Sequence, residues 1–126
     1  MEEKRAYLAK AQESLACAES EFAAGRYNTA ARNVYYAMFQ AAVAALLNEG
    51  VKPSRRWEHD FVHSRFSGLL VYRRKVYPSR FRHHLLEALT LRHRADYSPH
   101  PVDRRHVETY LTEGEELLHL IEERIE

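Results

Sequence analysis

Apolar residues recur at spacings of three and four along nearly the whole chain, and no stretch alternates with the period of two that a strand requires. This pattern predicts five helices, at about residues 2–24, 27–48, 57–70, 80–97 and 103–125. Gly25 and Gly50 follow the first two helices, and Pro99 and Pro101 break the chain after the fourth. Because the first connection is short, the first two helices should be antiparallel neighbours. We therefore expect an all-α, up-and-down bundle of four or five helices.

Three of the predicted helix starts carry residue types that commonly cap a helix N-terminus. Asn28 or Thr29 would cap the second helix, Ser79 the fourth and Asp103 the fifth. Residues 71–79 contain three basic residues, two tyrosines and a proline, and we expect this segment to be irregular.

The apolar stripe of the fourth helix ends in charged residues. It begins at Phe81 and passes through Leu85 and Ala88, and the same spacing then gives Arg92 and Asp96. A helix that becomes ionic on its buried side must pair those groups, let them reach water, or use them. Arg92 and Asp96 are one turn apart, so they can pair directly, or Asp96 can orient Arg92 toward a ligand.

The residues that follow give this helix end two interpretations. In the functional one, Arg92 or Arg94 binds a phosphate and His100 donates or accepts a proton. Cleavage of RNA by its own 2′-hydroxyl needs such groups and no metal ion. In the structural one, the ion pair simply closes the helix, and Asp96 accepts hydrogen bonds from the next loop. Tyr97 belongs to the same candidate site.

The second helix carries two adjacent tyrosines. Tyr35 and Met38 lie on its inward stripe, and Tyr36 lies about a hundred degrees further around the helix. A buried tyrosine hydroxyl needs a partner, which the ionic end of the fourth helix can supply. Packing is the favoured role of the stripe, and Tyr36 is kept as a candidate binding residue.

A histidine pair in the third helix raises the question of a metal site. His59 and His63 stand four residues apart, with Asp60 between them, in a pattern that approaches the zinc motif HExxH. A catalytic zinc ion needs a third protein ligand, and none follows at a suitable spacing. We favour partly exposed polar histidines here, and we expect neither a metal ion nor a cofactor.

Charge is unevenly distributed although the net charge is only +1. Residues 1–51 carry −1, residues 52–105 carry +8 and residues 106–126 carry −6. A basic middle suits an anionic ligand, nucleic acid or self-association, although an acidic helix packed beside a basic one also explains it. The single cysteine, Cys17, excludes an internal disulfide. With no apolar run of bilayer length and a charged start, we expect one soluble, cytoplasmic domain over residues 1–126, without membrane contact.

Three segments together resemble a known family. They are the stretch AARNVYYAMFQAA at residues 30–42, His59 with Phe66 seven residues later, and RHRADY at residues 92–97. In this order they are similar to the signature of small stand-alone HEPN proteins. The resemblance implies an all-helical bundle and a homodimer in which the fourth-helix ends meet across the two-fold axis. Many such proteins are metal-independent ribonucleases with an Arg-x(4–6)-His motif, or toxins encoded beside a minimal nucleotidyltransferase.

Two functional hypotheses remain open. In the first, the protein binds RNA or a nucleotide and cleaves RNA as the toxin of a two-gene system. The five residues between Arg94 and His100 fit the family's spacing, so these two would be catalytic, while Arg92, Asp96, Tyr97 and Tyr36 bind or orient. In the second, the protein is a non-catalytic module that binds a nucleotidyltransferase partner. The basic middle favours the first. Ala95, where the nuclease motif prefers a polar residue, favours the second.

Overall fold

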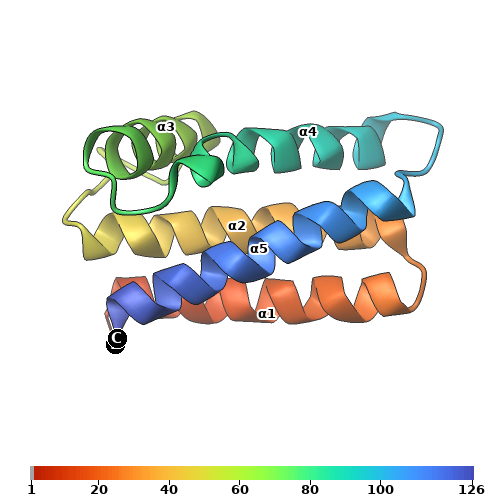
Figure 1. Ribbon diagram of the computed structural model, residues 1–126, viewed down its shortest axis with the longest axis horizontal. Helices are drawn as coiled ribbons and strands as arrows, with labels where there is room; N and C mark the ends of the chain where they lie inside the picture. Colours follow the sequence, from red (N-terminus) through yellow and green to blue (C-terminus); the bar gives the residue numbers. More distant parts are fainter. Residues whose placement is uncertain (1) are drawn as a thin grey trace.

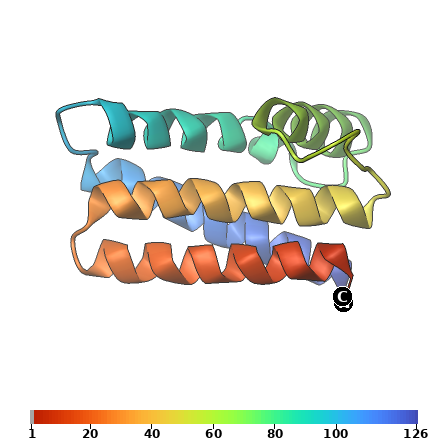
Figure 2. The ribbon, with the colours of Figure 1, turned by 180° about the vertical axis from the view of Figure 1, so that it is seen from behind.

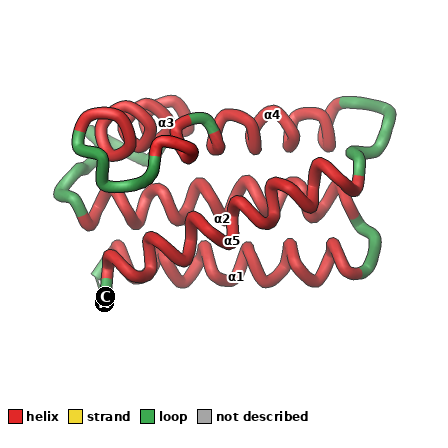
Figure 3. Tube along the Cα trace, in the orientation of Figure 1, coloured by secondary structure: helices red, strands yellow, loops and turns green. Residues whose placement is uncertain are grey.

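The computed structural model describes residues 2–126, and helices dominate it (Figures 1 and 3). The elements in chain order are α1 (Glu3–Ala23), α2 (Tyr27–Asn48), α3 (His59–Arg65), η1 (Phe66–Arg73), η2 (Ser79–Arg82), α4 (His84–Tyr97) and α5 (Arg104–Ile125). η1 is a π-helix that continues α3, and η2 is a 3₁₀ turn that leads into α4. No strand occurs within residues 2–126. The predicted all-α, up-and-down bundle is confirmed.

α2 is the central helix of the bundle. It packs against α1, α3, α4 and α5. α4 runs along the side of α2 away from α1, and α5 crosses one face of the α1–α2 hairpin diagonally, as the two opposite views show (Figures 1 and 2). The α1–α2 and α4–α5 connections lie at one end of the molecule, and the C-terminus lies at the opposite end (Figure 1). The end of α4 therefore lies beside the start of α2.

The sequence of α2 explains its central position. Every residue from Ala41 to Leu46 is buried, so this helix has no solvent face over these six residues. Helices that are apolar all round belong inside a protein, and the many alanines let neighbouring helices approach closely. The largest fully buried side chains of the core are Tyr35 of α2 itself and Phe66 and Phe81 of the segments that follow.

Only one of the three predicted N-terminal caps is correct. The side chain of Asp103 accepts a hydrogen bond from the backbone N–H of Arg105 at 3.2 Å and caps α5. α2 begins at Tyr27, before the predicted cap, and Asn28 Oδ1 instead accepts from the backbone N–H of Val102 at 3.0 Å. Ser79 begins the 3₁₀ turn η2 and makes no side-chain cap for it. Asn28 thus ties the loop after α4 to the start of α2.

The third helical segment is longer and less regular than predicted. Its α-helical part ends at Arg65, and the π-helix extends to Arg73, so only residues 74–78 of the expected irregular segment lack helical structure. Leu70 and Val71 are both buried. In a π-helix the backbone hydrogen bonds join residues five apart instead of four. The α-helical spacing of the apolar residues did not indicate this change.

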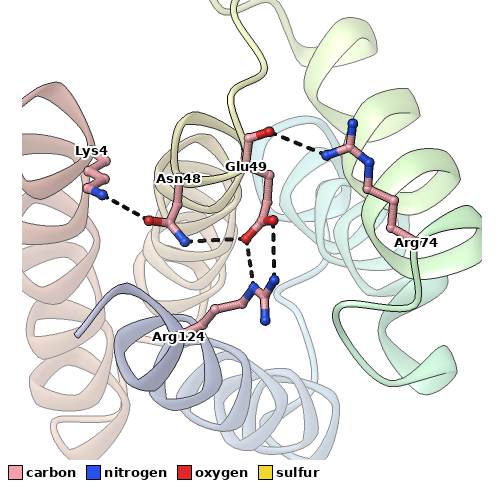
Figure 4. Close-up of polar contacts among 5 residues, drawn as sticks. All are labelled: Lys4, Asn48, Glu49, Arg74 and Arg124. Carbon is pink, nitrogen blue, oxygen red and sulfur yellow. Dashed lines mark hydrogen bonds and ion pairs between the residues drawn. The ribbon is translucent and has the colours of Figure 1, made fainter.

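A polar network fixes the opposite end of the bundle, where the chain ends (Figure 4). Glu49, just past α2, accepts hydrogen bonds from Arg124 Nε at 2.7 Å and from its Nη2 at 3.3 Å. Asn48 accepts from Lys4 Nζ at 2.9 Å, and the Glu49 carbonyl accepts from Arg74 Nη1 at 3.3 Å. The end of α2 is therefore joined to α1, α5 and the segment after η1.

In the part of the chain that the structure describes, no helix has both the length and the apolar character needed to span a membrane.

Candidate functional site

Asp96, near the end of α4, is shared by two arginines. Arg32 of α2 donates from Nε to Asp96 Oδ1, and Arg92 Nε lies 3.4 Å from Oδ2. The Arg32 hydrogen bond is the main reason that the pKa of Asp96 lies below its usual value, and the charge of Arg92 adds to the effect. Asp96 is therefore ionised at neutral pH, and one carboxylate joins α2 to α4.

The guanidinium of Arg92 lies over the two tyrosines of α2. It is 5.0 Å from the ring centroid of Tyr36 and 5.8 Å from that of Tyr35. Its Nε is buried and has no hydrogen-bond partner among the described residues. Arginine tolerates this environment because its charge is delocalised and attracted by aromatic faces. Arg92 is thus held in place from both sides, by Asp96 and by the tyrosines.

The hydroxyl of Tyr35 connects this cluster to α3. Tyr35 is fully buried, and its hydroxyl contacts His59 Nδ1 and lies 2.9 Å from His63 Nε2. A phenol has one proton to donate and lone pairs to accept, so it can donate to one imidazole and accept from the other. Burial raises the pKa of Tyr35 and lowers the pKa of both histidines, and so favours the neutral form of all three.

The expected partner of Tyr35 was wrong. The two histidines satisfy its hydroxyl, and the ionic end of α4 contacts its ring instead. His59 is exposed and His63 half-buried, as predicted, yet both reach inward. His59 also stacks on Phe39, with ring centroids 4.6 Å apart. The signal in the sequence was the spacing of four residues, which sets both histidines on the face of α3 that meets α2.

The other predicted site residues lie on different surfaces at the end of α4. Tyr97 is 80% exposed, and His100 is exposed in the following loop, where its backbone N–H donates to Ser98 Oγ at 3.2 Å. Arg94 faces α5 and helps to line a hollow of about 190 Å³. Across residues 2–126, no hydrogen bond or ion pair links Arg94 to His100 within one protomer.

Sequence reasoning overlooked two neighbours of Arg94. His106 and Tyr110 of α5 line the same hollow, together with Glu87 of α4. The Asp103 cap positions the first turn of α5 and so brings His106 to this face; His106 Nδ1 lies 3.7 Å from Asp103 Oδ2. His106 of α5, and not His100, is thus the histidine that shares a hollow with Arg94, although it lies outside the Arg-x(4–6)-His motif.

A wider basic hollow lies toward the start of α4. It encloses about 1030 Å³ between η1 and η2. Its lining includes three cationic side chains and two tyrosines but no acidic residue: Arg73, Lys75, Arg82, Tyr72 and Tyr77. The guanidinium of Arg82 lies 4.7 Å from the ring centroid of Tyr72. Cationic groups beside an aromatic ring suit a ligand that carries phosphate and a base.

Fold and site together define the class of protein: a helical bundle whose helices α2 and α4 are joined by an Arg–Asp–Arg cluster beside paired tyrosines. The sequence matches the HEPN domain over residues 5–124, and the chain belongs to the HEPN domain family. No curated protein is significantly similar to it. Membership of this family gives the protein a function related to nucleotides or RNA, and HEPN domains often dimerise.

Replacing Tyr35 by Phe tests the contact between α2 and α3. The change removes one buried hydroxyl, so His59 Nδ1 and His63 Nε2 lose their hydrogen-bond partner. We expect the free energy of unfolding to fall by about 1–3 kcal/mol, the usual cost of unsatisfied buried polar groups. Urea unfolding at neutral pH measures it. Tyr36→Phe is the matched control and should change stability by less than about 0.5 kcal/mol. Equal effects of the two changes would contradict the assignment.

Asp96→Asn tests the ionic cluster through pH. At neutral pH we expect the free energy of unfolding to fall by about 1–2 kcal/mol. Hydrogen bonds to charged groups can contribute more than this, but Arg32 is partly exposed and water weakens the pair. A carboxylate with a depressed pKa stabilises the fold above its unfolded-state pKa, and that contribution disappears as the pH falls through the folded-state value. The difference between wild type and variant in urea unfolding should therefore shrink in strongly acidic solution. A difference that stays constant there would refute the charged role.

Proposed function

We propose that the protein is a homodimer that binds RNA or a nucleotide and cleaves RNA without a metal ion, as the toxin of a two-gene system. One observation carries the proposal. Asp96 binds Arg32 and Arg92, whereas Arg94 forms no ion pair with any carboxylate among residues 2–126. An arginine without a carboxylate partner at the helix end is available to bind phosphate in bidentate fashion.

The proposed chemistry assigns separate roles to the exposed groups. His100 removes the proton from the 2′-hydroxyl of RNA, and the 2′-oxygen attacks the adjacent phosphorus. The bond from phosphorus to the 5′-oxygen breaks, and that oxygen takes a proton from His100 of the second protomer. The products are a 2′,3′-cyclic phosphate and a 5′-hydroxyl. Arg94 stabilises the charge on the phosphorane oxygens.

Asp96 and the tyrosines prepare the site. Asp96 fixes Arg92 and Arg32, so that a cluster with a net charge of +1 stays near the substrate without side-chain motion. Tyr97 is the exposed aromatic ring beside them. One face of the ring can pack in the dimer contact described below while the other stacks on a base, which stabilises binding of single-stranded RNA with little dependence on sequence. Tyr36 supports Arg92 from below. The basic hollow between η1 and η2 provides further phosphate contacts along the strand.

The outward face of α4 supports the homodimer. Leu86 is 58% exposed and Tyr97 80% exposed, and they stand eleven residues apart, which places them on the same face of the helix. Large exposed apolar side chains aligned on one helix face mark an interaction surface. A two-fold contact along this face brings the ends of the two α4 helices, and hence the two copies of Arg94 and His100, toward each other.

A second candidate function rests on Ala95. It is buried beside Arg94, so no polar side chain stands directly after that arginine to assist it. In this alternative the protein is a non-catalytic module, and the face of α4 that carries Leu86 and Tyr97 binds a minimal nucleotidyltransferase instead of supporting cleavage. Neither alternative uses a cofactor.

RNA cleavage in EDTA distinguishes the two functions. We expect the wild type to cleave labelled RNA with EDTA present, and His100→Ala to lower the rate by at least about 100-fold, because a positioned acid or base contributes that much. His106→Ala is the matched control, an exposed histidine on the adjacent helix, and should keep the activity. No cleavage by the wild type would favour the non-catalytic module. Loss of activity in His106→Ala alone would transfer the proton-transfer role to the smaller hollow.

Light scattering tests the dimer. At micromolar concentration we expect twice the protomer mass of 14.8 kDa for the wild type. Leu86→Glu places a charge in the proposed contact and should give the protomer mass. Tyr72→Glu changes another exposed apolar residue, outside α4, and should leave the dimer intact. A wild-type mass equal to that of one protomer would exclude the homodimer.

A further inference from the structure

His84, Glu87 and Glu113 converge between α4 and α5, away from the Asp96 cluster. Each offers one ligand atom, and these atoms all lie within 4.8 Å of one another. His84 and Glu87 are three residues apart and share a face of α4, while Glu113 comes from the middle of α5. Two helices thus present an imidazole and two carboxylates to one point, a donor set that transition metals bind.

His84 is unusual among the eight histidines because it is the buried polar residue of the core. It is 8% exposed, and its Nδ1 has no hydrogen-bond partner among the described residues. Glu113 Oε2 is likewise buried and without a partner. Buried polar atoms are almost always satisfied by protein, water or an ion, and an ion between the two helices would satisfy the Glu113 carboxylate. The ring of Phe81 packs edge-on against the imidazole at 5.0 Å and holds it in place.

The distance between His84 and Glu113 suits a shared ligand better than a direct bond. His84 Nε2 lies 3.5 Å from Glu113 Oε1. Good hydrogen bonds between nitrogen and oxygen are shorter, about 2.7–3.2 Å. Two ligands of a tetrahedral zinc ion, each bonded at about 2.1 Å, lie about 3.4 Å apart. Glu87 is exposed, so its flexible side chain can move the short distance needed to complete the set.

The surrounding charges also favour a cation. Neither Glu87 nor Glu113 forms an ion pair with a lysine or arginine in residues 2–126. The nearby Arg80 is engaged by Glu116, with Nη2 and Oε2 3.1 Å apart. Two carboxylates close together in a partly buried place repel each other, and a divalent ion between them removes that repulsion.

We propose that His84, Glu87 and Glu113 bind a divalent transition-metal ion, with zinc the best fit. One imidazole nitrogen and two carboxylate oxygens are zinc ligands, and three protein ligands leave a fourth position for water. The ion joins the first turn of α4 to α5, two helices that otherwise meet over a small area. The site shares no residue with Arg94 and His100, so it stands whether or not the protein cleaves RNA.

Calorimetric titration of EDTA-treated, desalted protein with zinc chloride tests this site. We expect one ion per protomer at saturation and a higher melting temperature in its presence, because a ligand that binds only the folded state stabilises it. Magnesium chloride should bind far more weakly, since an imidazole ligand favours transition metals. Glu87→Gln and His84→Gln should each weaken zinc binding by at least about tenfold. Substituting a residue that only supports a metal ligand already causes a loss of this size.

His119→Gln is the matched control. His119 is exposed, and its Nε2 lies 3.4 Å from Glu123 Oε1. The variant therefore measures how much an ordinary histidine–glutamate pair on the surface contributes to zinc binding. This variant should keep the wild-type affinity. Glu87 is on the surface, so Glu87→Gln keeps the test valid even if circular dichroism shows that His84→Gln is unfolded. Absence of saturable zinc binding by the wild type, or wild-type affinity in Glu87→Gln, would overturn the proposal.

Discussion

The arrangement of the site depends on one carboxylate that serves two arginines. Asp96 of α4 accepts a hydrogen bond from Arg32, 64 residues earlier in the chain, and pairs with Arg92 one turn before it. Removing the carboxylate would leave two positive charges close together with no counterion. Pairing of these half-buried charges favours the register of α4 on α2 that places Asp96 beside Arg32.

The contacts spread outward from this ion pair to a third helix. Arg92 lies over the rings of Tyr35 and Tyr36, and the hydroxyl of Tyr35 contacts His59 and His63 of α3. The cluster thus joins α2, α3 and α4 through a continuous set of polar and aromatic contacts. The groups proposed to meet RNA lie outside it, on the exposed end of α4. A rigid base beneath exposed groups is what a site needs if it is to bind without reorganising.

Helical periodicity was enough to predict the bundle, because four of its helices bury long, regular stripes. It failed at η1, where the hydrogen bonding changes from α to π and the helix extends to Arg73, and at Ser79, which begins a 3₁₀ turn. The ionic end of α4 was visible because Arg92 and Asp96 interrupt an apolar stripe. Arg32, the histidine partners of Tyr35 and the approach of Glu113 to His84 join residues distant in the chain, and only the fold reveals them.

A double-mutant cycle between Arg32→Gln and Asp96→Asn measures the central interaction most directly. Urea unfolding at neutral pH of the wild type, both single variants and the double variant gives the coupling energy. If Asp96 links α2 to α4 through Arg32, the changes are non-additive, with a coupling of about 1 kcal/mol, within the range for residues in one ion-pair network. Additive effects, within an error of about 0.3 kcal/mol, would contradict this account.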